Sequence, residues 1–176
     1  MQDRLTPLQR RVLQVLASVR PPWTLTGGAA LAGVHTGHRA TRDLDLFWQA
    51  VVLDLVADPV PLAEPPVTVS LEGVEIQVDT KHQILVNKLC AVLSRSELRD
   101  LSDVEALLAV GGDLPRALSD AGRHDGGFSP LNLAWVLREF PVEALAKAEG
   151  MAAEAAQALE TFRASFAERV ARAGTP

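Results

Sequence analysis

The 176-residue chain has one cysteine, no tyrosine and only 5% aromatic residues. A lone cysteine, Cys90, cannot form an internal disulfide, and its apolar helical neighbours indicate a small core residue rather than a nucleophile. No apolar run reaches the roughly 20 residues that cross a bilayer. The N-terminus also lacks the hydrophobic region of a signal peptide. The sequence therefore predicts a cytoplasmic protein with no membrane segment.

Positive charge is also scarce, because 17 Lys and Arg residues stand against 22 Asp and Glu residues, for a net charge of −5. This balance excludes a protein whose whole surface is built to coat nucleic acid, although it leaves room for a local basic pocket. Apolar residues make up 48% and charged residues 22%, which is typical of a globular chain. A chain of this length forms one domain, or a core with a helical appendage.

Apolar spacing divides the chain into a first part that mixes helices with strands and a second part made of helices. Helices are predicted at 7–19 and 29–34, strands at 23–26 and around 44–48, and a hairpin at 67–71 and 74–78. The four prolines of residues 58–66 predict a loop. Further helices are predicted near 84–92, 101–108, 114–121, 131–140 and 142–173. The order predicts an α+β fold with a core in residues 1–110 and a helical region, 111–176, packed on it.

The first pattern that suggests chemistry is the pair Asp43 and Asp45, two residues apart in a predicted strand. Such residues share a face, with about 6.6 Å between their Cα atoms, so both carboxylates can bind one Mg²⁺ ion and its substrate phosphates. A D-x-D triplet is expected by chance about 0.7 times in this chain, so its weight comes from its surroundings. The apolar residues around it argue against a solvated strand, and a cation should neutralise the pair.

The second pattern is Gly27-Gly28, which precedes the small-residue helix predicted at 29–34. Glycine lets the backbone approach a phosphate, and the N-terminus of a helix offers free N–H groups with a partial positive charge. By itself the pair is only a turn. It lies too far from any Lys-Ser/Thr pair to be a P-loop.

Other candidate positions have both a structural and a chemical interpretation. Asp79 is either a third carboxylate of the site or the cap of the helix that begins near Lys81. Lys88 either extends its amine to water or reaches a carboxylate cluster as a charge or phosphate partner. Arg99 and Asp103 are i, i+4 neighbours, and their simplest interpretation is a surface ion pair.

Four segments, in order GGAALAG, HRATRDLDLF, NKLCAVLSR and RDLSDVEALL, give the chain its family resemblance. Over roughly residues 23–110 the chain resembles the AbiEii-type toxin nucleotidyltransferases of bacteria, within the DNA polymerase β-like nucleotidyltransferase superfamily. The resemblance implies a small mixed sheet that binds a nucleoside triphosphate with Mg²⁺. It also implies transfer of a nucleoside monophosphate by in-line displacement at the α-phosphorus. The acceptor is the 3′ end of tRNA in related toxins and a protein side chain or a small molecule elsewhere in the superfamily, and an antitoxin protein is a further partner.

The resemblance also implies roles for individual residues. The catalytic set, residue by residue, is Asp43, Asp45, Lys88, Asp100 and Asp103. Nucleotide binding is assigned to Gly27, Gly28 and Arg39. The metal ligands are Asp43 and Asp45, with Asp79 as the third carboxylate.

The chain departs from the family pattern in two ways, and these motivate an alternative. The family commonly has Ser or Thr where this chain has Ala29, so a hydroxyl contact to phosphate is absent. The C-terminal half is short for the family, which leaves the acceptor unassigned. The alternative is a catalytically degenerate relative that keeps the nucleotidyltransferase fold and binds a partner protein or nucleotide without transfer. A plain nucleic-acid-binding domain fits the negative charge poorly.

Overall fold

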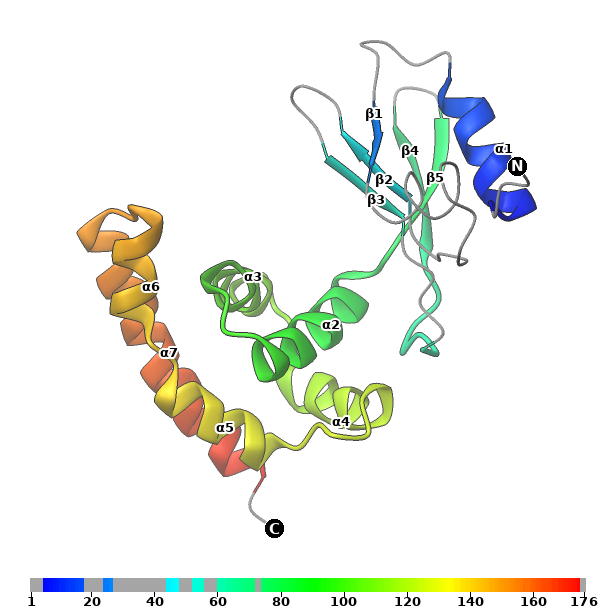
Figure 1. Cartoon of the computed structure of the whole chain (residues 1–176). Coiled ribbons are helices and arrows are strands. Elements are labelled where there is room, and N and C mark those ends of the chain that lie inside the picture. The colour runs from blue at the N-terminus through cyan, green and yellow to red at the C-terminus, as the bar shows by residue number, and fades with distance from the viewer. Residues whose placement is uncertain are drawn as a thin grey trace. The chain divides into compact units, whose positions relative to one another are not determined.

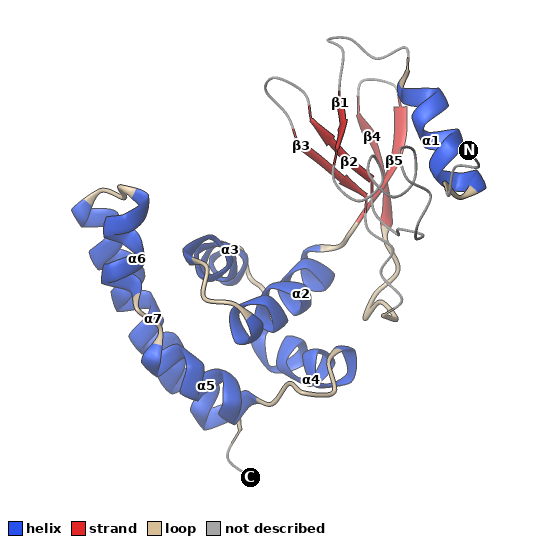
Figure 2. Ribbon diagram, in the orientation of Figure 1, coloured by secondary structure: helices blue, strands red, loops and turns tan. Residues whose placement is uncertain are grey.

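The structure, a computed structural model, describes residues 5–17, 24–26, 44–47, 52–55, 60–71 and 74–174. The chain forms two compact units, Met1–Pro59 and Val60–Pro176, whose helices and strands are labelled in Figure 1. The first contains helix α1 (Pro7–Leu16) and strands β1 (Thr24–Thr26), β2 (Leu44–Phe47) and β3 (Val52–Leu55). The second contains β4 (Val67–Leu71), β5 (Val74–Val78), α2 (Lys81–Ser94), α3 (Leu98–Ala109), α4 (Leu114–His124), α5 (Pro130–Glu139), α6 (Val142–Glu149) and α7 (Ala153–Ala173). The predicted α+β class with a helical C-terminal half is confirmed (Figure 2).

Helix α1 begins with a reciprocal capping box. The hydroxyl of Thr6 accepts the N–H of Gln9 at 3.2 Å, and Oε1 of Gln9 accepts the N–H of Thr6 at 2.8 Å. Pro7 fits the first helical position because its missing N–H would have no helical partner there. The predicted helix is confirmed to Leu16, and Val19, where the prediction placed its end, lies outside the described residues.

The sheet of the first unit has β2 as its central strand, paired antiparallel with β1 and β3. The register places Asp45 opposite Thr26 on one side and opposite Asp54 on the other. Strand β3 was not predicted, because a run of only four residues with one polar position has no clear period. The helix predicted at 29–34 lies outside the described residues.

Strands β4 and β5 form the predicted antiparallel hairpin, with Val67 opposite Val78 and Val69 opposite Ile76. The alternating apolar residues therefore come together on one face, as the period of two requires. Residues 60–66, the described part of the predicted loop, contain no helix or strand.

Helix α2 lies at the centre of the helical part of the second unit, in contact with α3, α4 and α5. Its buried apolar residues are Leu85, Val86, Leu89 and Val92. Each such side chain stabilises the fold by about 1.5–3 kcal/mol when it leaves water. Helix α5 packs along α7, in which the rings of Phe162 and Phe166 stack with centroids 5.2 Å apart. This core holds α2 in place between α3 and α4.

The single helix predicted at 142–173 is wrong, because the chain breaks between α6 and α7. Gly150 adopts a φ of 69°, which favours glycine, and its N–H donates to the carbonyl of Lys147 at 3.3 Å. The N–H of Met151 donates to the carbonyl of Ala146 at 2.9 Å. This pair of bonds is a Schellman motif, which ends one helix and redirects the chain into the next.

The compact units divide between Pro59 and Val60, so α2 and α3 share a unit with the four helices that follow them. The functional division into residues 1–110 and 111–176 stays a prediction. Among the described residues no helix combines the length and the apolar character that a membrane crossing needs.

Candidate functional site

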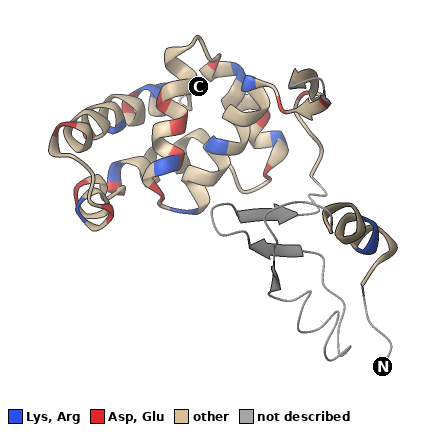
Figure 3. Cartoon of the chain, turned by 90° about the horizontal axis from the view of Figure 1, so that it is seen from above, with Lys and Arg blue, Asp and Glu red and all other residues tan. Residues whose placement is uncertain are grey.

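Helices α2 and α3 bring Lys88, Asp100 and Asp103 together in what we call the Lys88 cluster. The charged residues of these helices are coloured in Figure 3. Nζ of Lys88 lies 2.8 Å from Oδ1 of Asp100 and 2.5 Å from Oδ2 of Asp103. The two carboxylates are three residues apart, which puts them on the same side of α3. Three residues of the predicted catalytic set are thus direct neighbours.

The short link between the two helices creates this arrangement. Helix α2 ends at Ser94, and Arg95 is extended, with its N–H donating to the carbonyl of Ala91 at 2.8 Å. Helix α3 begins three residues later, so Asp100 lies in its first turn. A carboxylate is favoured there by the partial positive charge of the helix N-terminus.

The carboxylate of Asp100 is fully buried and bound on both oxygens. Its side chain is 0% exposed; Oδ2 accepts from Nε of Arg95 at 2.7 Å, and Oδ1 accepts from Nη2 of Arg95 at 3.3 Å and from Lys88. Burial by itself would raise the pKa of Asp100, but hydrogen bonds from Arg95 and Lys88 outweigh it and hold that pKa below its usual value. Asp100 is therefore an ionised anchor for two cations.

Lys88 and Asp103 are more open to solvent than Asp100, with exposed side-chain fractions of 22% and 45%. Burial acts to lower the pKa of Lys88, but hydrogen bonds to Asp100 and Asp103 more than compensate and raise it. The ammonium is therefore charged and has three N–H donors, of which the two carboxylates take two within the described part of the chain. The third has no hydrogen-bond or ion-pair partner among the described residues.

The surface ion pair between Arg99 and Asp103 that the spacing suggests does not form. Nη2 of Arg99 instead lies 2.7 Å from Oε2 of Glu97, while Asp103 pairs with Lys88. The simplest interpretation of that spacing is therefore wrong. Lys88 reaches the carboxylates instead of extending alone into water.

The other predicted site residues are less fully described. Gly27, Gly28, Arg39 and Asp43 lie outside the described residues, and of Asp45 the structure describes only its place on β2.

Half-buried Asp79 directly precedes Thr80, the residue that caps α2 by accepting the N–H of Gln83 at 3.0 Å. The interpretation of Asp79 as the cap is therefore wrong. Its predicted role as a metal ligand stays a prediction. Within the side chains that the structure describes, no group of three or more His, Cys, Asp or Glu residues is placed to hold a metal.

The register of β2 brings two acidic positions, Asp45 and Asp54, directly opposite each other. Directly opposed residues of antiparallel strands lie on one face, so Thr26, Asp45 and Asp54 share a face of the sheet. Two opposed carboxylates are unfavourable without a counter-ion, and oxygen donors are the ligands that Mg²⁺ takes. Asp54 was missed because β3 was missed. The available signal was an Asp within an apolar run soon after the D-x-D strand.

A second charged cluster joins α2 to α4 through the carboxylate of Asp120. Its Oδ2 lies 2.7 Å from Nε2 of His82 and 3.7 Å from Nε of Arg116, and its Oδ1 lies 3.2 Å from Nη1 of Arg123. The hydrogen bond from His82 lowers the pKa of Asp120 most. Sequence reasoning missed this cluster, because its members come from two helices separated by α3.

Neighbouring contacts fasten residues 60–66 to the same two helices. Oε1 of Glu64 lies 2.6 Å from Nη2 of Arg116, and its Oε2 accepts the hydroxyl of Thr80 at 2.5 Å. The fully buried Gln83 accepts the N–H groups of Ala63 and Glu64 at 2.6 and 3.2 Å. This second cluster therefore has a structural role, since it ties a loop to the helical core.

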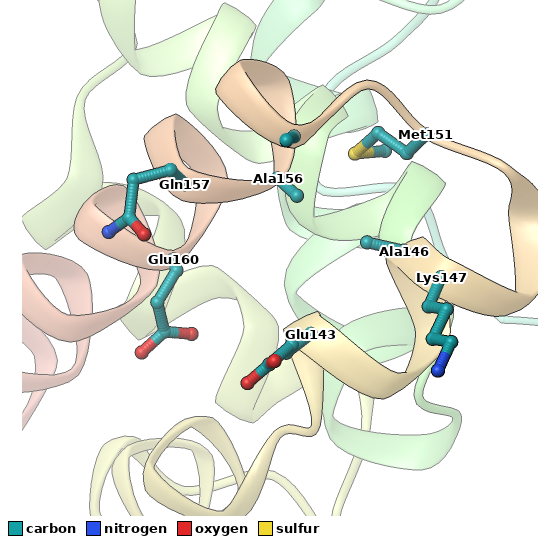
Figure 4. Close-up of a pocket in the computed structure, with 8 residues that line it drawn as sticks. Glu143, Ala146, Lys147, Met151, Ala156, Gln157 and Glu160 are labelled. Atoms are coloured by element: carbon teal, nitrogen blue, oxygen red, sulfur yellow. The ribbon is translucent and has the colours of Figure 1, made fainter.

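One cavity of the second unit, of about 410 Å³, lies between α6 and α7. Its lining includes Glu143, Ala146, Lys147, Gln157 and Glu160 (Figure 4). It contains none of the predicted site residues. Cys90 is half-buried against the core, and burial raises the pKa of its thiol to about 11, which agrees with a core residue rather than a nucleophile.

Comparison with known protein families gives one match. Residues 48–172, more than half of the chain, match the family described as "Nucleotidyl transferase AbiEii toxin, Type IV TA system". The matched segment begins directly after β2 and contains Asp79, Lys88, Asp100 and Asp103. Searches of the curated proteins and of the solved structures gave no match.

Proposed function

Because the chain belongs to the AbiEii nucleotidyl transferase toxin family, which makes it a transferase, we propose that it moves a nucleoside monophosphate from a nucleoside triphosphate to an RNA acceptor. The acceptor that we favour is the 3′ end of a tRNA, and a protein side chain is the other candidate. The protein would act in the cytoplasm as the toxin of a toxin-antitoxin pair, with an antitoxin as its partner.

The observation that carries the proposal is the Lys88 cluster, which lies within the segment that matches the family. An ammonium that is charged, one-fifth exposed and held by two carboxylates is suited to bind a phosphate oxygen at a constant position. Transfer from a triphosphate depends mainly on positioning and on the neutralisation of phosphate charge. Lys88 would supply part of both.

In this proposal Asp100 and Asp103 have different roles. Asp100 is buried and bound to two cations, so it orients Lys88 and does not meet substrate. Asp103 is nearly half exposed and has Lys88 as its ion-pair partner in the described part of the chain. A bound phosphate oxygen would share the ammonium with it.

Asp43 and Asp45 would hold Mg²⁺, with Asp79 as the third carboxylate that the family resemblance implies. Bound at these oxygens, Mg²⁺ would neutralise charge on the transferred phosphate. Asp54 supports this assignment, because it stands opposite Asp45 in register and adds a carboxylate to the same face of the sheet.

The nucleotide would be bound by Gly27, Gly28 and Arg39. The two glycines would offer backbone N–H groups to the phosphates, and Arg39 would offer a guanidinium. Since position 29 is alanine, no hydroxyl is available there, so backbone groups would make the contact.

The test is transfer of label from nucleoside triphosphates labelled on the α-phosphorus, supplied one at a time with Mg²⁺, to total bacterial tRNA or to added protein extract. We expect a labelled acceptor with the wild type, none with Asp45→Asn, and wild-type labelling with the matched control Asp113→Asn, whose residue caps α4. No label with any triphosphate, or equal label with Asp45→Asn, would contradict the proposal.

A second candidate is a degenerate relative that binds nucleotide without transfer. Ala29 favours it, as does the family match, which does not extend over the glycine pair or the D-x-D motif. Calorimetry separates the two functions, because this candidate predicts nucleoside triphosphate binding without labelling across the same acceptor panel.

A further inference from the structure

Arg95 contacts the Lys88 cluster through Asp100, but the proposed function gives it no role. It follows the last residue of α2, and its side chain turns to α3, where Nε and Nη2 donate to the two oxygens of Asp100 at 2.7 and 3.3 Å. A guanidinium that meets a carboxylate in this two-point way restricts its orientation more than a single hydrogen bond does.

This two-point contact sets the direction in which Asp100 meets Lys88. Oδ1 of Asp100 receives both Nη2 of Arg95 and Nζ of Lys88, while Oδ2 is taken by Nε of Arg95. Rotation of the carboxylate would break the Arg95 bonds, so Oδ1 stays directed at Lys88. The position of the ammonium thus depends on a residue that does not contact it.

Arg99 shows that this arrangement is specific to Arg95. It lies beside Asp100 in the sequence, yet its guanidinium pairs with Glu97 and makes no ion pair with Asp100 among the contacts of the described residues. Both arginines are substantially exposed, at 49% and 69% of their side chains, so a general need for charge at this surface does not distinguish them. Nε of Arg95 also lies 3.7 Å from Oε1 of Glu97, so the two arginines differ in that only Arg95 of the pair binds Asp100.

We propose that Arg95 is a positioning residue of the transferase, which orients Asp100 so that Asp100 holds the Lys88 ammonium in place for a phosphate. The inference rests on the proposed function and deepens it. It predicts that loss of Arg95 affects the rate of transfer more than the binding of nucleotide, and that the effect passes through Asp100.

The first experiment measures transfer of labelled nucleotide to total tRNA by Arg95→Gln, Arg95→Lys and the matched control Arg99→Gln. We expect Arg95→Gln to lower kcat about tenfold or more with KM for the triphosphate changed less than threefold, Arg95→Lys to recover part of the loss, and Arg99→Gln to match the wild type. In an Asp100→Asn background, Arg95→Gln should add less than a twofold loss, because the residue through which it acts is already altered.

The second experiment does not require transfer. A brief acetylation of the folded proteins, with the exposed Lys147 as internal reference, reports how firmly the Lys88 amine is held. We expect Lys88 to become several-fold more reactive in Arg95→Gln and to stay at its wild-type level in Arg99→Gln.

The outcomes separate the two proposals. Wild-type kcat in Arg95→Gln, full additivity with Asp100→Asn, or unchanged Lys88 reactivity would overturn the role of Arg95 while leaving the transferase intact. A wild type without transfer would overturn the proposed function. In that case the acetylation result still decides whether Arg95 positions Lys88.

Discussion

The two charged clusters on either side of α2 are built from similar parts and differ in what they leave open. Asp100 of α3 binds Lys88 and Arg95, whereas Asp120 of α4 binds His82, Arg116 and Arg123. Each has a nearly or fully buried carboxylate that binds a basic residue of α2 and at least one arginine from a second segment.

The difference lies in the basic residue that α2 contributes. The ammonium of Lys88 is 22% exposed and is shared with the half-exposed Asp103, so part of it stays open to solvent. The ring of His82 is only 10% exposed, and the contacts around it close a loop onto the core. Exposure of the basic residue on α2 therefore distinguishes the two clusters, and in the proposed function only the more exposed one, at Lys88, meets substrate.

The largest effect should come from replacing the basic residue that α2 contributes to each cluster. Lys88→Met should lower nucleotide transfer about 100-fold or more, because a charged donor to phosphate is lost. His82→Gln should leave transfer within about twofold of the wild type and lower stability instead. Transfer assays on both variants, with circular dichroism to verify folding, test the difference. Equal loss of transfer in the two variants would contradict it.

A smaller effect should separate the two carboxylates that hold Lys88. Asp100→Asn should reduce the unfolding free energy by about 2–3 kcal/mol, because two cations lose their buried partner. Asp103→Asn should cost less than about 1 kcal/mol, because exposed ion pairs contribute little. Urea denaturation measures both values. Similar losses of unfolding free energy in the two variants would mean that the burial of Asp100 does not matter for stability.

The loss of stability at acid pH should also depend on the buried carboxylate of Asp100. Asp100 has a folded-state pKa below its ordinary 3.8, so its contribution to stability is complete above pH 3.8 and is lost as pH falls through the folded-state pKa. The wild type should therefore lose stability more steeply below pH 3.8 than Asp100→Asn, by at most about 1.4 kcal/mol per pH unit for one carboxylate. Urea titrations at several acidic pH values would show it. Parallel curves of stability against pH for the wild type and Asp100→Asn would contradict this prediction.

The smallest effect is expected at the outer edge of the Asp120 cluster. Arg123 is 76% exposed and is one of three basic residues around that carboxylate, so Arg123→Gln should change the unfolding free energy by less than about 0.5 kcal/mol. Transfer should be unchanged. A loss of transfer in this variant would mean that the second cluster also meets substrate, which calorimetry with tRNA could then examine.

Much of the fold could be predicted because its signals are local. The hairpin followed from alternating apolar residues around Glu72-Gly73, and α2 to α5 followed from helical spacing. Two failures were also local. Strand β3 was too short to have a clear period, and the Ala-rich sequence on both sides of Gly150 hid the break between α6 and α7.

The residues of the Lys88 cluster could be named from the sequence, but the contacts between them could not. Lys88, Asp100 and Asp103 could be named from the resemblance, yet spacing within one helix paired Asp103 with Arg99, and the structure pairs it with Lys88. Distances between helices are not encoded in any local period. The metal-binding and nucleotide-binding roles of Asp43, Asp45, Asp79 and Arg39 stay predictions.

By itself the sequence determined the change from a mixed first part to a helical second part, the α+β class and the family to which the chain belongs, since these depend on periodicity and on motifs in order. Only the tertiary structure decided that Asp100 is buried between Lys88 and Arg95 while Asp103 stays half exposed. The reason is physical: burial and ion pairing depend on how α2 and α3 pack, and packing is set by the whole core rather than by the residues of the site.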